Sequence, residues 1–168
     1  MYGVTNSMKF TKNVLLTIFA AVMGLVMLGL VSAPLRAATA TNTFAVNATV
    51  QATCSVAATP LAFGTYAPTA ASANTATVTV TCTNTTPYTL GLNAGLNGTV
   101  TARAMKSGAV LLNYGLFTDS GHTINFVTLA SVNGTGSPVV TTVYGQVPSG
   151  QYVAPNTYSD TITATISY

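Results

Sequence analysis

The sequence predicts a small all-β domain folded as an antiparallel sandwich. After residue 41, segments in which apolar and polar residues alternate recur along the chain, and turn-forming residues separate them. No stretch in this region repeats apolar residues at helical spacing. Strands that bury one face alternate with a period of two, and many short strands with a turn about every ten residues are typical of a sandwich.

Three segments alternate most clearly, at residues 43–53, 76–82 and 161–168, and threonine fills most positions on their polar face. β-Branched side chains suit the solvent face of a strand. Shorter strands are expected at 88–92, 109–117, 124–129 and 139–144. The turns between them are predicted at Asn97-Gly98, Ser107-Gly108, Asp119-Ser120-Gly121, Asn133-Gly134 and Pro148-Ser149-Gly150.

Residues 1–40 have the pattern of a secretory signal peptide. Lys9 and Lys12 precede an apolar run from Val14 to Val31, and Ala38-Thr39-Ala40 offers the Ala-x-Ala pattern that a signal peptidase reads. An uncleaved membrane anchor is the alternative, because a run of this length can just span a bilayer. The small-residue site favours cleavage, which leaves residues 41–168 as the exported domain.

Cleavage would remove most of the positive charge. Residues 41–168 keep two basic side chains, Arg103 and Lys106, and two acidic ones, Asp119 and Asp160. Such a surface has no basic patch to attract nucleic acid or an anionic membrane. Because so few charges oppose association, we expect other protein subunits as partners and no nucleic acid.

Cys54 and Cys82 predict a disulfide, since an even pair in an exported protein is usually oxidised. Its loop of nearly thirty residues would stabilise the fold by about 3–4 kcal/mol in the chain-entropy model. A metal site would need more ligands than these two cysteines and the lone His122. We therefore expect no metal ion and no other cofactor.

No catalytic residue is expected. Catalysis needs a nucleophile with a base, a pair of carboxylates or a metal cluster, whereas Asp119 and His122 flank one tight turn, where both residue types are common for structural reasons. Asp160 stands at the start of the last strand, where we expect it to bond to backbone or to pair with Arg103. Both roles are structural.

Residues 43–53 have two interpretations that the pattern leaves open. They are the first strand of their own sandwich, or they are a strand donated to a second subunit, whose exposed edge they would complete. A donated strand would fill pockets with Phe44, Val46, Ala48 and Val50. Burial of the three larger side chains would supply about 5–9 kcal/mol before ordering costs. Head-to-tail donation does not close on itself, so it builds a filament.

Short motif pieces run in order along the exported domain. They are Phe44-x-Val46 through Cys54, Phe63-Gly64-x-Tyr66, Val78-x-Val80-x-Cys82, Arg103-x-Met105, Leu112-x-Tyr114-x-Leu116-Phe117-x-Asp119, Tyr144-Gly145-x-Val147-Pro148 and Tyr158-x-Asp160-Thr161-x-Thr163-x-Thr165-x-x-Tyr168. In these pieces the chain resembles the spore coat protein U family, which includes the subunits of archaic chaperone–usher pili of Gram-negative bacteria.

The resemblance implies an immunoglobulin-like sandwich that lacks its last strand and is completed by donor-strand exchange. A periplasmic chaperone fills the gap first, and at the outer-membrane usher the N-terminal segment of the next subunit replaces it. By position, residues 41–52 would be the donor strand, and residues 158–168 would border the acceptor groove, with the Tyr168 carboxylate held by the chaperone. The groove edge would carry Ile162, Ala164, Ile166 and Tyr168.

Three positions depart from the family pattern. Asn156 stands where glycine is common, Phe126 where tryptophan is frequent, and Ala48 is a small member of the donor face.

The function implied is that of a structural pilus subunit, exported through the periplasm to the cell surface for adhesion and biofilm formation. A structural coat protein of a spore or cyst is one alternative. A carbohydrate-binding tip module is another, although such modules typically need a second domain.

Overall fold

The computed structural model describes residues 36–168. Most of the predicted signal peptide, residues 1–35, lies outside this range. The chain divides after Asn47 into an N-terminal segment and a β-domain, Ala48–Tyr168. Among residues 36–168, no helix has the length and apolarity needed to cross a membrane.

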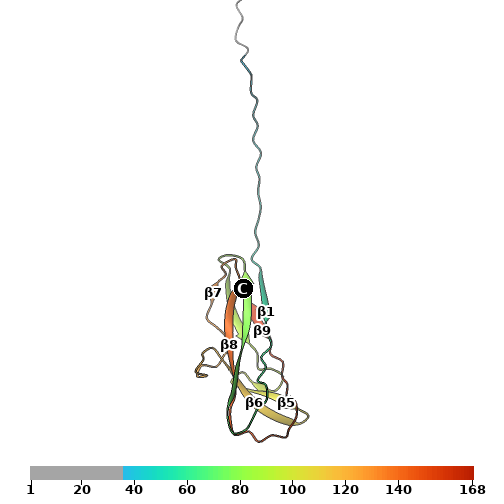
Figure 1. Ribbon diagram of the computed structural model, residues 1–168. Coiled ribbons are helices and arrows are strands. Elements are labelled where there is room, and N and C mark those ends of the chain that lie inside the picture. Colours follow the sequence, from blue (N-terminus) through green and yellow to red (C-terminus); the bar gives the residue numbers. More distant parts are fainter. Residues whose placement is uncertain (1–35) are drawn as a thin grey trace, which may run out of the picture. The chain divides into compact units, whose positions relative to one another are not determined.

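The described part of the β-domain contains nine strands in two antiparallel sheets (Figure 1). The six-stranded sheet has the order β1-β2-β8-β6-β5-β4, and the three-stranded sheet has the order β7-β3-β9. The strands are β1 Cys54–Ala58, β2 Ser72–Cys82, β3 Pro87–Leu92, β4 Gly98–Thr99, β5 Ala102–Ser107, β6 Val110–Phe117, β7 Val132–Asn133, β8 Val139–Val147 and β9 Ala164–Ser167. The predicted all-β antiparallel sandwich is confirmed.

The core lies between the two sheets and follows the alternation of the sequence. β2 turns its apolar residues inward and its threonines outward, and β3 and β6 alternate in the same way. Phe126, at a position where tryptophan is frequent in the family, is completely buried. The buried apolar side chains are Ala76, Val78, Val80, Cys82, Tyr88, Leu90, Leu92, Ala104, Leu112, Tyr114, Leu116, Phe126, Val143 and Val147.

The disulfide between Cys54 and Cys82 is present, as predicted. The two cysteines stand directly opposite each other in the antiparallel pairing of β1 with β2. Cys54 is the first residue of β1, so the disulfide joins the beginning of an edge strand to the strand beside it. The covalent bond therefore holds β1 at its N-terminal end.

Two of the predicted strands do not form among the described residues. Residues 124–129 make only isolated bridges, Phe117 with Asn125 and Gly91 with Thr128. Residues 43–53 form no strand among the described residues, and β1 begins only at Cys54. The alternation of residues 43–53 makes them suitable for a strand, but a strand forms only against a neighbouring edge. Among these described residues only Thr53, next to β1, has a backbone partner, the N–H of Thr83.

Candidate acceptor groove

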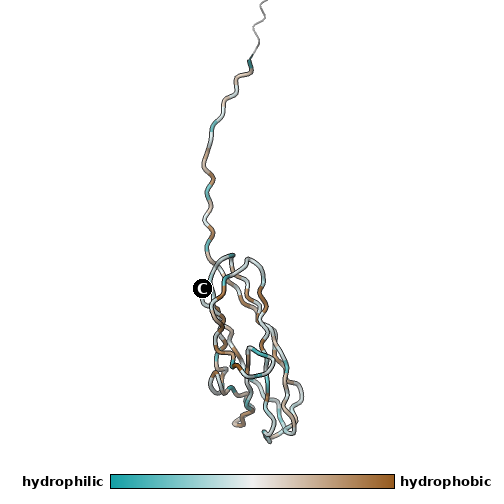
Figure 2. The backbone as a smooth tube through the Cα atoms, turned by 90° about the vertical axis from the view of Figure 1, so that its left-hand side faces the viewer, coloured by the Kyte–Doolittle hydropathy of each residue, from teal (hydrophilic) through white to brown (hydrophobic). Residues whose placement is uncertain are grey.

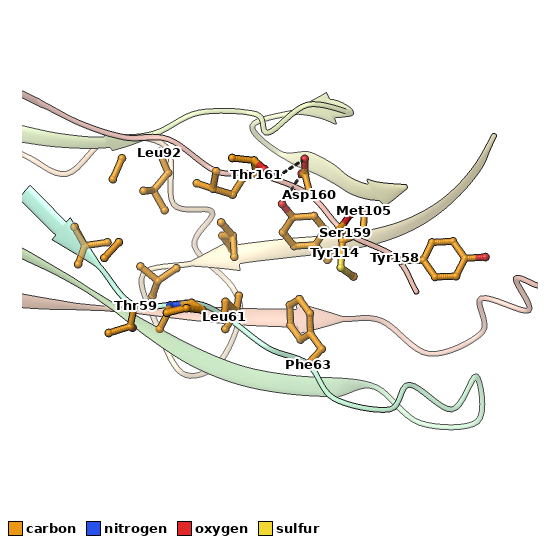
Figure 3. A pocket seen from close by; sticks show the side chains of 18 residues that line it. Thr59, Leu61, Phe63, Leu92, Met105, Tyr114, Tyr158, Ser159, Asp160 and Thr161 are labelled. Carbon is orange, nitrogen blue, oxygen red and sulfur yellow. Dashed lines mark hydrogen bonds between the residues drawn. The ribbon is translucent and has the colours of Figure 1, made fainter. Parts of the chain in front are cut away.

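A groove of about 430 Å³ opens between the edge strands of the two sheets. Residues 58–63, which continue from β1, form one wall, and residues 158–164, which lead into β9, form the other (Figure 3). Beyond the end of the groove, β1 and β9 lie close to each other (Figure 1). The floor is apolar, because core side chains that are themselves almost fully buried line the groove between the walls. These are Ala76, Val78, Leu92, Leu116 and Val143.

The first wall is bonded to β2 through both backbone and side-chain groups. The Thr59 N–H donates to the Thr77 carbonyl, and the Thr59 hydroxyl oxygen accepts from the Thr77 N–H at 2.8 Å. Farther along, the Ser72 hydroxyl donates to the Phe63 carbonyl at 3.0 Å. Because these bonds replace a regular ladder, the wall leaves the sheet gradually and turns its apolar side chains toward the groove. Sequence reasoning missed this wall, although its Phe63-Gly64-x-Tyr66 piece was among the family motifs.

Gly145 of β8 makes room for this wall. A Cβ atom at residue 145 would meet Leu61 Cδ2 and would stand 3.0 Å from Phe63 Cζ. The backbone of Gly145 does not need a positive φ, so its small size is what matters here. Leu61 and Phe63 thus lie against bare backbone, which holds the wall close to the sheet.

Gly145→Ala is therefore expected to push Leu61 and Phe63 outward. Overpacking of this kind costs about 1–3 kcal/mol of the free energy of unfolding. Urea denaturation of the variant and the wild type measures this difference. An unchanged unfolding midpoint would show that the wall does not depend on the missing side chain.

The second wall passes from one sheet to the other. Ser159 exchanges two backbone hydrogen bonds with Lys106 of β5, in the six-stranded sheet. Ala164 then pairs with Leu92 of β3, in the three-stranded sheet. The predicted strand at residues 161–168 is accordingly shorter than expected, because its first residues cross between the sheets.

A polar cluster lies at this crossing. Asp160 accepts hydrogen bonds from the Leu96 N–H at 2.8 Å, the Thr161 N–H at 2.8 Å and the Tyr114 hydroxyl at 2.7 Å. Burial and the hydrogen bond to Asp160 raise the pKa of Tyr114 above its ordinary value. Figure 3 shows Tyr114 and Asp160 meeting at the side of the groove. The expected bonding of Asp160 to backbone is confirmed.

Arg103 lies near this cluster and is only 1% exposed. Its guanidinium donates to the carbonyls of Asn93 at 2.9 Å, Leu92 at 3.2 Å and Phe126 at 2.9 Å. An ion pair with Asp160 does not form among the described residues. Nε and Nη2 donate to these carbonyls, and the buried Nη1 has no partner there. Burial lowers the pKa of Arg103, and the nearby Tyr114 and Asp160 oppose that shift.

Both walls offer unpaired backbone to an incoming strand. Among residues 36–168, the N–H and carbonyl groups of Leu61 and of Ile162 have no hydrogen-bond partner. Such groups at sheet edges are a template for pairing with another segment. A second hollow of about 680 Å³ shares Leu61, Phe63 and Tyr158 with the groove and extends it between residues 61–68 and 151–158.

The predicted donor residues lie in extended chain without secondary structure. Phe44, Val46 and Val50 are 86%, 82% and 83% exposed, and Ala48 is exposed as well. Figure 2 shows hydrophobic and hydrophilic residues alternating along the segment before β1. Large side chains so exposed are unusual in a soluble protein, and their alternation gives one apolar face if the segment becomes a strand.

The predicted groove-edge residues take different positions. Ile162 and Ala164 line the groove. Ile166 is half-buried against the core, and Tyr168, which follows β9, is 62% exposed. The structure thus brings the first two of these four residues to the groove. The assignment of all four as its edge stays a prediction.

Asp119 and His122 belong to a structural turn. The Asp119 carboxylate accepts from the Ile124 N–H at 2.8 Å, and from the N–H and the hydroxyl of Thr123. His122 has a φ of 57°, in the left-handed region. Among the described residues, no group of three His, Cys, Asp or Glu side chains could hold a metal ion.

These bonds predict a pH-dependent contribution to stability. The hydrogen bond from Ile124, with those from Thr123, holds the pKa of Asp119 below its ordinary value of 3.8. Because the folded-state pKa is depressed, the contribution is present above that value and is lost as pH falls through the folded-state pKa. The melting temperature of the wild type should exceed that of Asp119→Asn near neutral pH, and the difference should shrink in acid. A difference that stays constant with pH would contradict this role.

Comparison with known proteins identifies the family of this chain. The family model of the Spore Coat Protein U domain matches residues 40–165. The chain belongs to the spore coat protein U domain family. One relative in this comparison, protein U of Myxococcus xanthus, is 34% identical over 158 residues, which cover 80% of this chain and 88% of that protein.

A solved structure agrees with this family. One chain of the crystal structure of the CsuC–CsuE chaperone–tip adhesion subunit pre-assembly complex, from the archaic chaperone–usher Csu pili of Acinetobacter baumannii, superposes with a TM-score of 0.55 at 26% identity. The match covers 71% of this chain and 40% of that chain, so this spore coat protein U domain spans less than half of that chain's length. The sandwich is accordingly immunoglobulin-like.

Proposed function

We propose that this chain is a structural subunit of an archaic chaperone–usher pilus and that its groove receives an extended segment of another subunit. The observation that carries the proposal is the apolar groove between two edges whose Leu61 and Ile162 backbone groups have no partner among the described residues. An alternating strand placed there would bond to both walls and cover the apolar floor of the groove.

The occupant is the segment of residues 41–52 from a second copy. Phe44, Val46, Ala48 and Val50 would point to the apolar floor, while Ala45, Asn47, Thr49 and Gln51 would face solvent. Burial of the three larger side chains supplies about 5–9 kcal/mol before ordering costs. Each subunit then has one groove and one donor segment, so assembly continues head to tail.

A chaperone precedes the second subunit in this proposal. A sandwich with an open apolar groove associates without control, so a partner must cover the groove until assembly. The likeness to a chain of a chaperone–tip adhesion subunit complex supports a periplasmic chaperone as that partner. Export by the signal at residues 1–40, exchange at an outer-membrane usher, and adhesion and biofilm formation at the cell surface complete the proposed function.

A coat protein is the second candidate, and the match to the family model of the Spore Coat Protein U domain favours it. Such a protein would also be exported and would also associate. It would be deposited as a layer around a spore or cyst, without an usher.

Electron microscopy with gold-labelled antibody against the chain separates the two functions. We expect labelled filaments on cells that carry the gene, none on cells that lack it, and none on cells that lack the usher. A labelled layer without filaments, unaffected by loss of the usher, would overturn the pilus assignment and support the coat protein.

A further inference from the structure

The second wall of the groove is held by side chains at the place where it changes sheets. Ser159 is bonded to β5 and Ala164 pairs with β3, which belong to different sheets. Between these two points, Ile162 has no backbone hydrogen bond within the described chain. The position of Ile162, and with it the width of the groove, therefore depends on what anchors its neighbours.

One anchor is Asp160. Its carboxylate receives the Leu96 N–H, from the loop before β4, and the Tyr114 hydroxyl, from β6. Both partners are distant in sequence, so these bonds tie the wall to the body of the domain. The third bond, from the Thr161 N–H, fixes the direction in which the chain continues.

The other anchor reaches Thr163 through Asn93. The Thr163 N–H donates to the Asn93 side-chain oxygen at 2.8 Å, and the Thr163 carbonyl accepts from the Asn93 N–H at 3.1 Å. The Asn93 carbonyl in turn accepts from Arg103 Nε at 2.9 Å. Arg103 thereby connects β5 to the residue that holds the wall on the far side of Ile162.

We propose that Asp160, Tyr114 and Arg103 are positioning residues that keep the 158–164 wall at the distance a bound strand requires. This inference rests on the proposed function, since it concerns the same groove. A strand can bond to both walls only if their separation suits two ladder spacings of about 4.8 Å each. Residues 160–162 of this wall have no backbone pairing within the described chain, so they meet that condition only when side chains fix them.

The cost of the cluster supports a role beyond stability. Arg103 and Tyr114 are buried, and removing charged or polar groups from water costs free energy that a well-packed apolar cluster does not incur. Stability alone is equally well served by apolar side chains of similar volume. Directional hydrogen bonds, in contrast, define where the wall lies.

The test measures donor binding separately from stability. The full-length exported chain, purified from the periplasm, is titrated into a fluorescein-labelled peptide with the sequence of residues 41–52, and fluorescence anisotropy gives Kd. Tyr114→Phe and Asp160→Asn are the test variants. Asp119→Asn is the matched control, because Asp119 also accepts bonds from two N–H groups and one hydroxyl but lies in the turn of residues 119–124 and does not line the groove. Urea denaturation gives the stability of each variant, and binding is measured where circular dichroism shows it folded.

We expect Kd to rise at least tenfold in both test variants and to stay within twofold in the control. If these residues only stabilise the fold, the test variants will have a lower urea midpoint but an unchanged Kd when folded. That result would overturn the inference. If Asp160→Asn does not fold, Tyr114→Phe decides, since it keeps the ring and removes one hydroxyl. If the wild type does not bind the peptide at all, the proposed function itself fails.

Discussion

A chain that lacks residues 41–50 is expected to fold and to bind its chaperone but to form no polymers. The deleted residues carry no strand, and their large apolar side chains are exposed, so the core loses nothing. The deletion removes the apolar face of the donor. Burial of its three larger side chains in the groove would supply about 5–9 kcal/mol of binding free energy before ordering costs. Polymers that resist SDS are detected as a ladder of bands on unheated gels. Co-purification of the chain with its chaperone shows that the groove can still bind a partner.

A matched pair of variants refines this result within the same segment. Phe44→Ser with Val46→Ser removes two residues of the apolar face, whereas Asn47→Ser with Gln51→Ser changes two residues of the opposite face. We expect the first pair to abolish the ladder and the second to preserve it. Equal ladders from both pairs, or polymers that persist in the deletion, would refute the donor assignment.

Loss of the disulfide is expected to have the largest effect on stability. The bond closes a loop across 28 positions of sequence, and removing it should lower the free energy of unfolding by about 3–4 kcal/mol. For a domain of this size the melting temperature should fall by about 10 °C. The variant is Cys54→Ser with Cys82→Ser, which leaves no unpaired thiol, and thermal unfolding followed by circular dichroism measures the change.

The position of the disulfide adds a local consequence. β1 is an edge strand of five residues whose pairing with β2 begins at the disulfide, and its continuation forms a wall of the groove. Without the bond, β1 should fray from the residue next to the donor segment. Reduced wild-type protein is the control, and its melting temperature should equal that of the variant. A variant that melts at the wild-type temperature would show that strand pairing alone holds β1.

Local patterns in the sequence predicted much of the sandwich. The inward residues of β2, from Ala76 to Cys82, were visible as a period-two alternation, because each side of a strand has its own environment. The pairing of Cys54 with Cys82 followed from their number and from export. β5 was not predicted, because the buried Arg103 interrupts the apolar pattern by which a strand is identified.

The segment of residues 43–53 shows the limit of such patterns. Its alternation indicates a strand, yet alternation says nothing about which chain supplies the neighbouring edge. In the structure these residues form no strand and expose their apolar face. From the sequence, residues 43–53 could be either the first strand of their own sandwich or a strand donated to a second subunit. The assignment as donor stays a proposal.

By itself the sequence determined the all-β class, the disulfide and the alternating segment before it, since each depends on neighbours along the chain or on residue type alone. The family resemblance implied one border of the groove, at residues 158–168, and only the tertiary structure decided the opposite wall and thus where the groove opens. Its walls are residues 58–63 and 158–164, about a hundred positions apart, and Asp160 meets Leu96 and Tyr114 across 64 and 46 positions. Contacts at such separations arise from how two sheets end beside each other, which no local pattern encodes.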